Sequence, residues 1–301
     1  MRIMLVGVVV VACVLAAYLL LVGEDGVPAP QPAANYQVTG PEMQRGLATY
    51  VITSDYQEKP CPVWVLLPDK FDKAQQYKVL YILPALEGGD NEGVREAKKL
   101  GLANKYNILC VGPGFSRMPW YGDNPGNPKI RYDSYLPDVI VPFIDKTYPT
   151  IAKPEGRVLV GFSKSGLGAL SILLRHPEVF GRAGAWDAPL LEDGLRADYY
   201  GTKENYMKEY YIPTLLAKRA DMLKDQPARI AITGLGWGGI EAGHKEMEKL
   251  KIPHYWNPNP KVNHEWKSGW LGPLVDVLMA EDMAKAPVTP AAPAPAEIKP
   301  K

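Results

Sequence analysis

One short stretch, residues 158–170, constrains the fold of this chain more than any other part of the sequence. It reads VLVGFSKSGLGAL: an apolar run, a turn with a serine between small residues, and then a helix-forming segment. A turn this tight requires small residues two before and two after the serine, and Gly161 and Ser165 meet that requirement. Such a turn exposes the hydroxyl of Ser163 at the end of a strand, so the pattern predicts a nucleophilic serine. The alternative is an ordinary strand–turn–helix with surface serines.

Predicted strands and helices alternate along the middle of the chain. The expected strands are 48–53, 62–67, 79–83, 108–111, 158–162, 183–186, 230–233 and 253–256. The expected helices are 94–102, 135–148, 166–174, 206–223, 241–250 and 271–280. This alternation predicts an α/β fold, a mostly parallel sheet with helices on both faces. Sites in such sheets lie at the carboxyl ends of the strands, where Ser163 falls.

The two ends of the chain differ from its middle in composition. Residues 3–22 carry no charge, and twenty such residues can span a bilayer as a helix. Arg2 before the run and acids after it place the bulk of the chain outside the cytoplasm. We therefore expect an extracytoplasmic protein, anchored to the membrane by its N-terminal segment or secreted. The expected parts are an anchor or signal segment (1–22), a Pro/Ala-rich linker (23–36), one α/β domain (37–286) and a disordered Pro/Ala-rich tail (287–301).

Composition excludes several kinds of partner. The net charge is +1 and no basic cluster occurs, so nucleic acid is not an expected partner. No Cys/His spacing resembles a metal site, and we expect neither a metal nor a cofactor. Cys61 and Cys110 could form a disulfide outside the cytoplasm, although Cys110 lies in an apolar strand where buried free thiols are common.

A serine nucleophile needs a base, and the chain offers four histidines. Three lie at the end of the helix after the serine, in a predicted helix and in a predicted strand: His176, His244 and His254. His264 lies in a loop between the last predicted strand and the last predicted helix. That loop carries the base in chains with the order serine, acid, histidine, so His264 is the predicted base.

Two residues are candidates for the carboxylate that would orient this base. The usual position follows the strand 230–233, but 234–240 contains no acid and Glu241 comes late. Asp187 follows the strand 183–186, next to the strand that carries the serine. Asp187 is the preferred acid, and Glu241 remains the alternative.

Acyl transfer also needs N–H donors for the developing oxyanion. The backbone N–H of Lys164 is one candidate, and the N–H of Leu86 is the other, because Pro84 has none. Trp120 and Tyr121 lie in an aromatic loop after a strand end and are candidate substrate-binding residues, with a packing role as the alternative.

Three motifs resemble the esterase family that includes S-formylglutathione hydrolases, feruloyl esterases and secreted mycolyltransferases. They are GFSKSG at 161–166, LPAL at 83–86 and NHEW at 263–266, and the resemblance spans about 45–285. It implies an α/β-hydrolase fold and a serine hydrolase that cleaves small-molecule or carbohydrate esters through an acyl-enzyme on Ser163. The mycolyltransferases likewise carry a serine two residues after the nucleophile, a His-x-Trp motif and a leucine N–H in the oxyanion hole, which favours His264 and Leu86.

The chain departs from that family at two points. The His-Gly or Asp-Gly often found before the oxyanion loop is Pro84-Ala85 here, and the usual acid position is empty. Two alternative functions therefore stay open. One is an acyltransferase that uses the same triad, and the other is a non-catalytic binding protein on a degenerate hydrolase scaffold.

Overall fold

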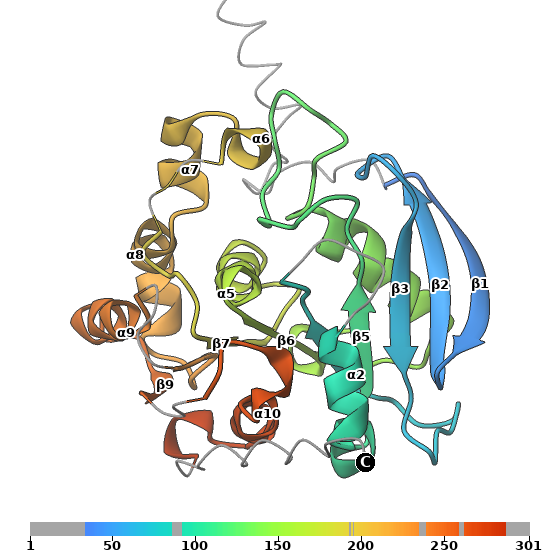
Figure 1. The fold of residues 1–301 in the computed structure, drawn as a ribbon. Coiled ribbons are helices and arrows are strands. Elements are labelled where there is room, and N and C mark those ends of the chain that lie inside the picture. The colour runs from blue at the N-terminus through green and yellow to red at the C-terminus, as the bar shows by residue number, and fades with distance from the viewer. Residues whose placement is uncertain are drawn as a thin grey trace, which may run out of the picture. The chain divides into compact units, whose positions relative to one another are not determined.

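A nine-stranded sheet runs through the chain, in the strand order β1-β2-β3-β5-β4-β6-β7-β8-β9 (Figure 1). The computed structural model describes residues 34–85, 92–192, 194, 196–234, 239–258 and 262–286. The strands are β1 (Tyr36–Gln44), β2 (Leu47–Ser54), β3 (Cys61–Leu66), β4 (Val79–Ile82), β5 (Leu109–Pro113), β6 (Arg157–Phe162), β7 (Arg182–Trp186), β8 (Ile230–Thr233) and β9 (His254–Asn257).

The sheet is parallel from β5 to β9 and antiparallel at its other edge. β4 pairs in parallel with both β5 and β6, and β7, β8 and β9 continue the parallel series. β1, β2 and β3 are antiparallel to one another, and β3 is antiparallel to β5. β4 and β5 are continuous apolar runs, and β6 and β7 are apolar after a first arginine, because helices cover both faces of these strands.

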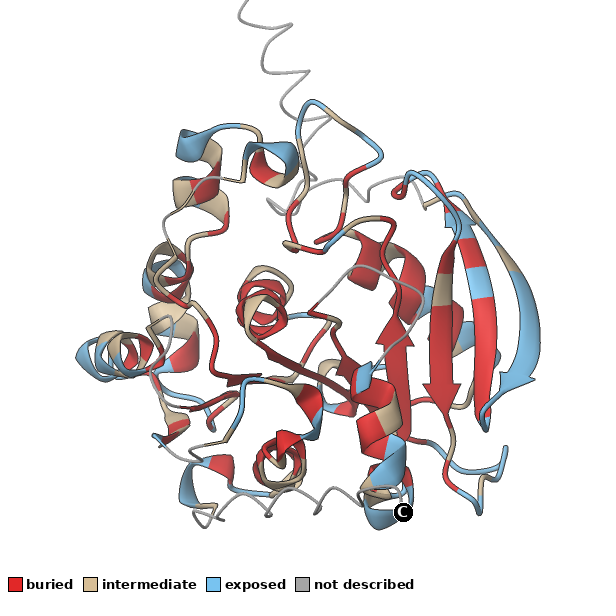
Figure 2. Ribbon diagram, in the orientation of Figure 1, coloured by how far each residue is buried: buried red, intermediate tan, exposed pale blue. Residues whose placement is uncertain are grey.

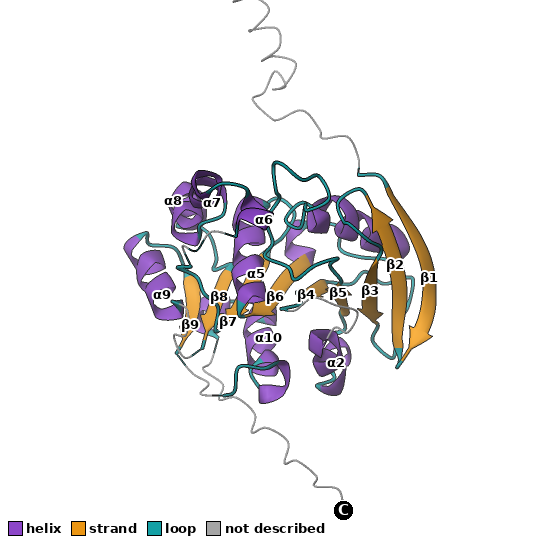
Figure 3. Cartoon of the chain, turned by 45° about the horizontal axis from the view of Figure 1, so that its top comes forward, coloured by secondary structure: helices purple, strands orange, loops and turns teal. Residues whose placement is uncertain are grey.

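Helices lie on both faces of the sheet, with α5 on one face and α2 and α10 on the other (Figure 3). The helices are α2 (Glu92–Lys99), α3 (Leu102–Tyr106), α4 (Val141–Thr147), α5 (Lys164–Arg175), α6 (Ala197–Tyr200), α7 (Lys203–Glu209), α8 (Ile212–Leu223), α9 (Ile240–Lys249) and α10 (Leu271–Met279). A π-helical turn, Leu136–Ile140, precedes α4, and 3-10 turns occur at Pro154–Gly156, Trp266–Ser268 and Met283–Lys285. The predicted α/β-hydrolase fold class, a mostly parallel sheet covered on both faces, is confirmed.

The core follows the central strands. Every residue of β4, β5 and β6 is buried, whereas β1 is largely exposed (Figure 2). Cys61 and Cys110 are both free and buried, so the disulfide allowed by the sequence does not form. Burial raises the pKa of both thiols to about 12, which keeps them protonated at neutral pH.

Three local predictions need correction. β1 and α3 were not expected, and the predicted helix 206–223 is two helices, α7 and α8. α7 ends at Glu209, and Tyr211 is the extended cap of α8, whose first turn contains Pro213. A proline lacks an N–H and its ring clashes with the carbonyl four residues earlier, so it suits the first turn of a helix and not its interior.

The predicted anchor (1–22), most of the linker and the tail (287–301) lie outside the described residues. Among the helices that the structure does describe, none is both long and apolar enough to cross a membrane.

Candidate active site

Ser163 lies at the sharp turn between β6 and α5, as the sequence predicted. Its backbone has φ 53° and ψ −134°, a region that non-glycine residues rarely adopt. Ser165 braces the turn, because its Oγ accepts from the N–H of Phe162 at 3.0 Å and donates to the carbonyl of Phe162 at 2.8 Å. A Cβ on Gly161 would come within 2.4 Å of the Ser165 carbonyl group, so only glycine fits there. The turn therefore holds Ser163 partly exposed at the carboxyl end of β6.

The structure brings Asp187 and His264 together. Nδ1 of His264 lies 2.8 Å from Oδ2 of Asp187, within hydrogen-bond distance. The Asp187 side chain is 5% exposed and that of His264 is 37% exposed, so a buried carboxylate faces a partly open imidazole. Because Nδ1 faces the carboxylate, it carries the proton, and Nε2 is left to accept one.

Register places this pair beside the serine. β6 and β7 are neighbouring parallel strands in which Phe162 pairs with Trp186. Ser163 and Asp187 therefore follow adjacent strand ends, and the N–H of Ser163 donates to the carbonyl of Trp186 at 3.0 Å. The His264 ring packs on the aromatic residues that precede Ser163 and Asp187. Its centroid lies 5.0 Å from that of Phe162 and 5.7 Å from that of Trp186.

Hydrogen bonds from Ser268 and Trp270 hold the loop that carries His264. The carbonyl of Glu265 accepts from the indole N–H of Trp270 and from the hydroxyl of Ser268, each at 2.9 Å. Trp270 in turn stacks on Trp186, with ring centroids 5.2 Å apart and planes 7° from parallel. No hydrogen bond joins Ser163 Oγ to His264 within the described part of the chain, and such bonds are often long before substrate binds.

Glu241 lies apart from this pair. It is in the first turn of α9, where its carboxylate pairs with Lys245 at 2.7 Å and its side chain is 61% exposed. The helix leaves it facing solvent, so the structure brings together Asp187 and His264 but not Glu241 and His264.

Lys164 is the first residue of α5, and its backbone N–H has no acceptor among the described residues. Leu86, the other predicted oxyanion donor, lies outside the described residues. The two residues before it are fixed by side chains: the carbonyl of Pro84 accepts from the hydroxyl of Tyr121 at 2.5 Å, and that of Ala85 accepts from the ammonium of Lys164 at 2.7 Å.

Trp120 and Tyr121 have different positions. Tyr121 is 1% exposed and packs beneath the segment that contains Pro84, so its ring does not face solvent. Trp120 is partly exposed, and its carbonyl accepts from the hydroxyl of Tyr200. Trp120 is therefore the member of this pair that is open to a ligand.

Backbone strain is concentrated at this site. Six non-glycine residues of the described chain have positive φ, and three of them are Tyr121 (53°), Ser163 (53°) and Asp187 (45°). Residues in such conformations cost about 1–3 kcal/mol each and cluster at functional sites.

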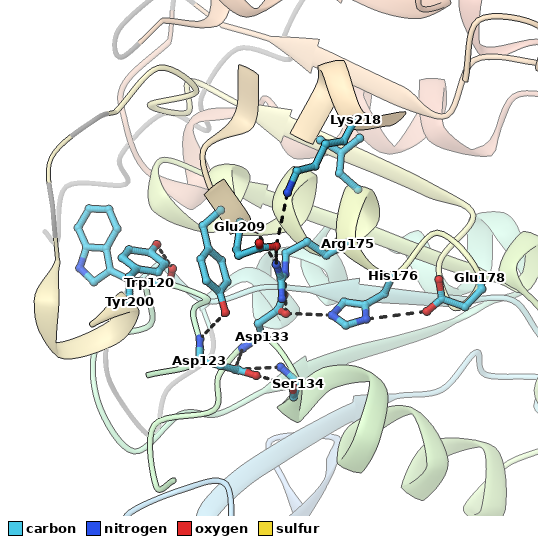
Figure 4. Close-up of polar contacts among 12 residues, drawn as sticks. Trp120, Asp123, Asp133, Ser134, Arg175, His176, Glu178, Tyr200, Glu209 and Lys218 are labelled. Carbon is cyan, nitrogen blue, oxygen red and sulfur yellow. Dashed lines mark hydrogen bonds and ion pairs between the residues drawn. The ribbon is translucent and has the colours of Figure 1, made fainter. Parts of the chain in front are cut away.

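A separate polar cluster ties the far end of α5 to its surroundings (Figure 4). The buried carboxylate of Asp133 accepts from Arg175 Nε at 2.8 Å and lies 3.0 Å from His176 Nε2. Burial alone would raise the pKa of Asp133, but the charges of His176 and Arg175 outweigh it and lower that pKa. Burial followed by the Asp133 charge raises the pKa of the neighbouring Asp123 to about 6. This cluster secures α5 and is not part of the Asp187–His264 pair.

The sequence analysis did not predict three supporting roles: Ser165 as a brace, Tyr121 as a partner of Pro84, and Trp270 as the support of the His264 loop. The small-residue rule for the turn was the one signal available for Ser165. Within the described residues, no group of three or more His, Cys, Asp or Glu side chains is placed to hold a metal.

Part of the sequence matches a known protein family. Residues 54–191 match the family described as "Putative esterase". An esterase of Mycobacterium tuberculosis (strain ATCC 25618 / H37Rv) is 28% identical over 142 residues, which cover 45% of this chain and 30% of that protein. This chain thus aligns with less than a third of the relative's length.

Solved structures extend the likeness of fold to most of the chain. An S-formylglutathione hydrolase from Agrobacterium tumefaciens has a TM-score of 0.65 at 14% identity, covering 82% of this chain and 99% of its own. A ferulic acid esterase has a TM-score of 0.61 at 19% identity, covering 81% and 97%. The resemblance predicted from the sequence motifs is confirmed: residues 54–191 match the esterase family, and the fold of most of the chain is similar to that of an S-formylglutathione hydrolase.

Proposed function

We propose that this chain is a carboxylic ester hydrolase with Ser163 as nucleophile, His264 as base and Asp187 as the carboxylate that orients the base. The observation that supports this most is the 2.8 Å contact between His264 Nδ1 and Asp187 Oδ2, beside a serine in a strained turn. A buried carboxylate on Nδ1 fixes the tautomer in which Nε2 can accept the hydroxyl proton.

The proposed reaction proceeds in two halves. His264 Nε2 removes the proton of Ser163 Oγ as the oxygen attacks the ester carbonyl, and the N–H of Lys164 donates to the resulting oxyanion. The tetrahedral intermediate collapses, His264 returns the proton to the leaving alcohol, and an acyl-enzyme remains on Ser163. Water, deprotonated by His264, then releases the acid and restores the serine.

Hydrolysis of p-nitrophenyl acetate by the full chain tests this proposal. Ser163→Ala should abolish turnover and also labelling by a fluorophosphonate. Asp187→Asn should lower kcat by up to about 10⁴-fold, the effect of the equivalent change in a serine protease. Glu241→Gln is the matched control, because its exposed carboxylate pairs with Lys245, and turnover should be retained.

Two outcomes would contradict the assignment. A parent chain with neither turnover nor fluorophosphonate labelling would favour a binding protein on a hydrolase scaffold. A larger loss in Glu241→Gln than in Asp187→Asn would replace the acid.

We further propose that residues 1–22 direct the domain out of the cytoplasm. The uncharged run after Arg2 supports this. A fusion of residues 1–36 to a reporter that is active only after export would be active if the proposal is correct, and inactive otherwise.

A further inference from the structure

The side chain of Lys164 is a partly buried cation beside the nucleophile. Its ammonium donates to the carbonyl of Ala85 at 2.7 Å and lies 5.7 Å from the ring centre of Trp120. Burial lowers its pKa, and no carboxylate lies within ion-pair distance of it in the described part of the chain. An ammonium has three N–H donors, so two remain for a ligand.

A second cation approaches the same indole. The guanidinium carbon of Arg196 lies 4.5 Å from the ring centre of Trp120. The guanidinium forms an ion pair with the carboxylate of Glu192 at 3.8 Å, which is beyond hydrogen-bond distance, and both side chains are partly exposed. Among the described residues the Arg196 guanidinium donates no hydrogen bond, so its planar set of donors is available.

The loop that carries Trp120 is tied to a neighbouring helix. The hydroxyl of Tyr200 donates to the carbonyl of Trp120, which ties the loop to α6, and Figure 4 shows these two side chains together. The carboxylate of Asp187, at the neighbouring strand end, is 5% exposed and faces His264. Among the described residues, Glu192 offsets part of this positive charge through its ion pair with Arg196, whereas no acid forms an ion pair with the Lys164 ammonium.

We propose that Lys164 and Arg196 bind an anionic group of the substrate, so that the esters cleaved at Ser163 carry a carboxylate or phosphate near the scissile bond. This rests on the proposed function, since it names the substrate class of that same site. The Lys164 ammonium is partly buried and has no ion-paired acid among the described residues. Such a charge is costly, and a substrate anion supplies a partner for it. The Trp120 ring, which both cations approach, packs against the apolar part of the substrate.

Two matched substrate pairs test the inference: 4-acetoxybenzoate against 4-acetoxybenzamide for an anion on the alcohol side, and mono-4-nitrophenyl adipate against 4-nitrophenyl hexanoate for the acyl side. The readout is the ratio of kcat/KM for the anionic ester to that for the neutral one, which cancels any change in basal activity. In at least one pair, Lys164→Met and Arg196→Gln should each lower this ratio about tenfold, and added salt should lower it in the parent. Lys249→Met, which removes an exposed charge from α9, is the control and should leave the ratio unchanged.

A binding measurement separates this inference from the proposed function. The Ser163→Ala chain is titrated calorimetrically with 4-acetamidobenzoate and 4-acetamidobenzamide, which are amide analogues of the first substrate pair. Tighter binding of the anion that is lost on adding Arg196→Gln supports the inference even if the parent hydrolyses no ester. Turnover of neutral esters with an unchanged ratio in both variants and both pairs would overturn the inference and leave the proposed function standing. A ratio that falls equally in Lys249→Met would also overturn it, because general charge would then explain the effect.

Discussion

Gly168 on α5 faces the ring of Tyr121 so closely that adding one methyl group to it should destabilise the fold. An ideal Cβ at this position would lie 2.2 Å from Cδ2, 2.4 Å from Cγ and 2.7 Å from Cε2 of Tyr121. The ring cannot move aside easily, because Tyr121 is 1% exposed and packs edge-on against Phe115 with centroids 5.4 Å apart. Gly168→Ala therefore forces either the helix or the ring to shift.

Two opposing effects determine the size of the change. Alanine is better than glycine inside a helix by about 1 kcal/mol. Overpacking a buried site costs about 1–3 kcal/mol, and three ring atoms at these distances place Gly168 at the upper end of that range. We expect Gly168→Ala to lower the free energy of unfolding by about 1–2 kcal/mol.

Removing the ring should reverse the sign. In a Tyr121→Ala background the methyl group meets no ring, so Gly168→Ala should raise the free energy of unfolding by about 1 kcal/mol. Urea unfolding of the four chains gives the coupling energy between the two positions, expected at about 2–3 kcal/mol. Stabilisation by Gly168→Ala in both backgrounds would refute the close packing argued from these distances.

Two further predictions concern the carboxylates of the polar cluster, where pH should act in opposite directions. Asp133→Asn leaves His176 and its neighbouring arginine without their buried counterion, which should cost about 3–5 kcal/mol at pH 7. Since the folded state lowers the pKa of Asp133, its contribution is present above pH 4 and is lost as pH falls, so urea unfolding below pH 4 should show a smaller difference from the parent. Asp123 has a folded pKa of about 6, so ionising it as pH rises from 4 to 6 costs the parent up to about 3 kcal/mol, and Asp123→Asn should gain relative stability over that interval. A difference between Asp123→Asn and the parent that does not change from pH 4 to pH 7 would contradict this.

The central strands and the serine turn could be predicted because local sequence decides them. After their first arginines β6 and β7 are apolar, and Ser163 directly follows β6 with small residues two before and two after it, as a tight turn requires. β1 was missed for the converse reason. Its side chains are mostly exposed, so no hydrophobic pattern marks it, and it is a strand because it pairs with β2 along nearly its whole length.

The sequence narrowed the acid to two residues and favoured Asp187, but it left Glu241 open as the alternative. The choice depends on which strand end lies beside the His264 loop, and this is a property of the assembled sheet. The pairing of β6 with β7 puts Asp187 one strand away from Ser163, whereas α9 turns Glu241 toward solvent and Lys245. The sequence contains both candidate acids, but the strand pairing that places one of them beside the serine is visible only in the folded sheet.

The strained backbone at the site could not be predicted, because local preference opposes it. Left-handed φ favours glycine, yet Tyr121 and Asp187 occupy it. In both cases a glycine elsewhere in the chain lies against the strained residue: Gly168 against the Tyr121 ring, and Gly234, at φ 130°, with its missing Cβ 2.7 Å from the N of Asp187. Tyr121 and Asp187, both with strained backbone, thus each pack against a glycine, where any larger residue would collide with them. The local cost at Asp187 is offset by contacts from β8 across the sheet, since its N–H donates to the carbonyl of Thr233 at 2.9 Å. Residues of this kind depend on partners far away in the sequence, so they become visible only in the folded chain.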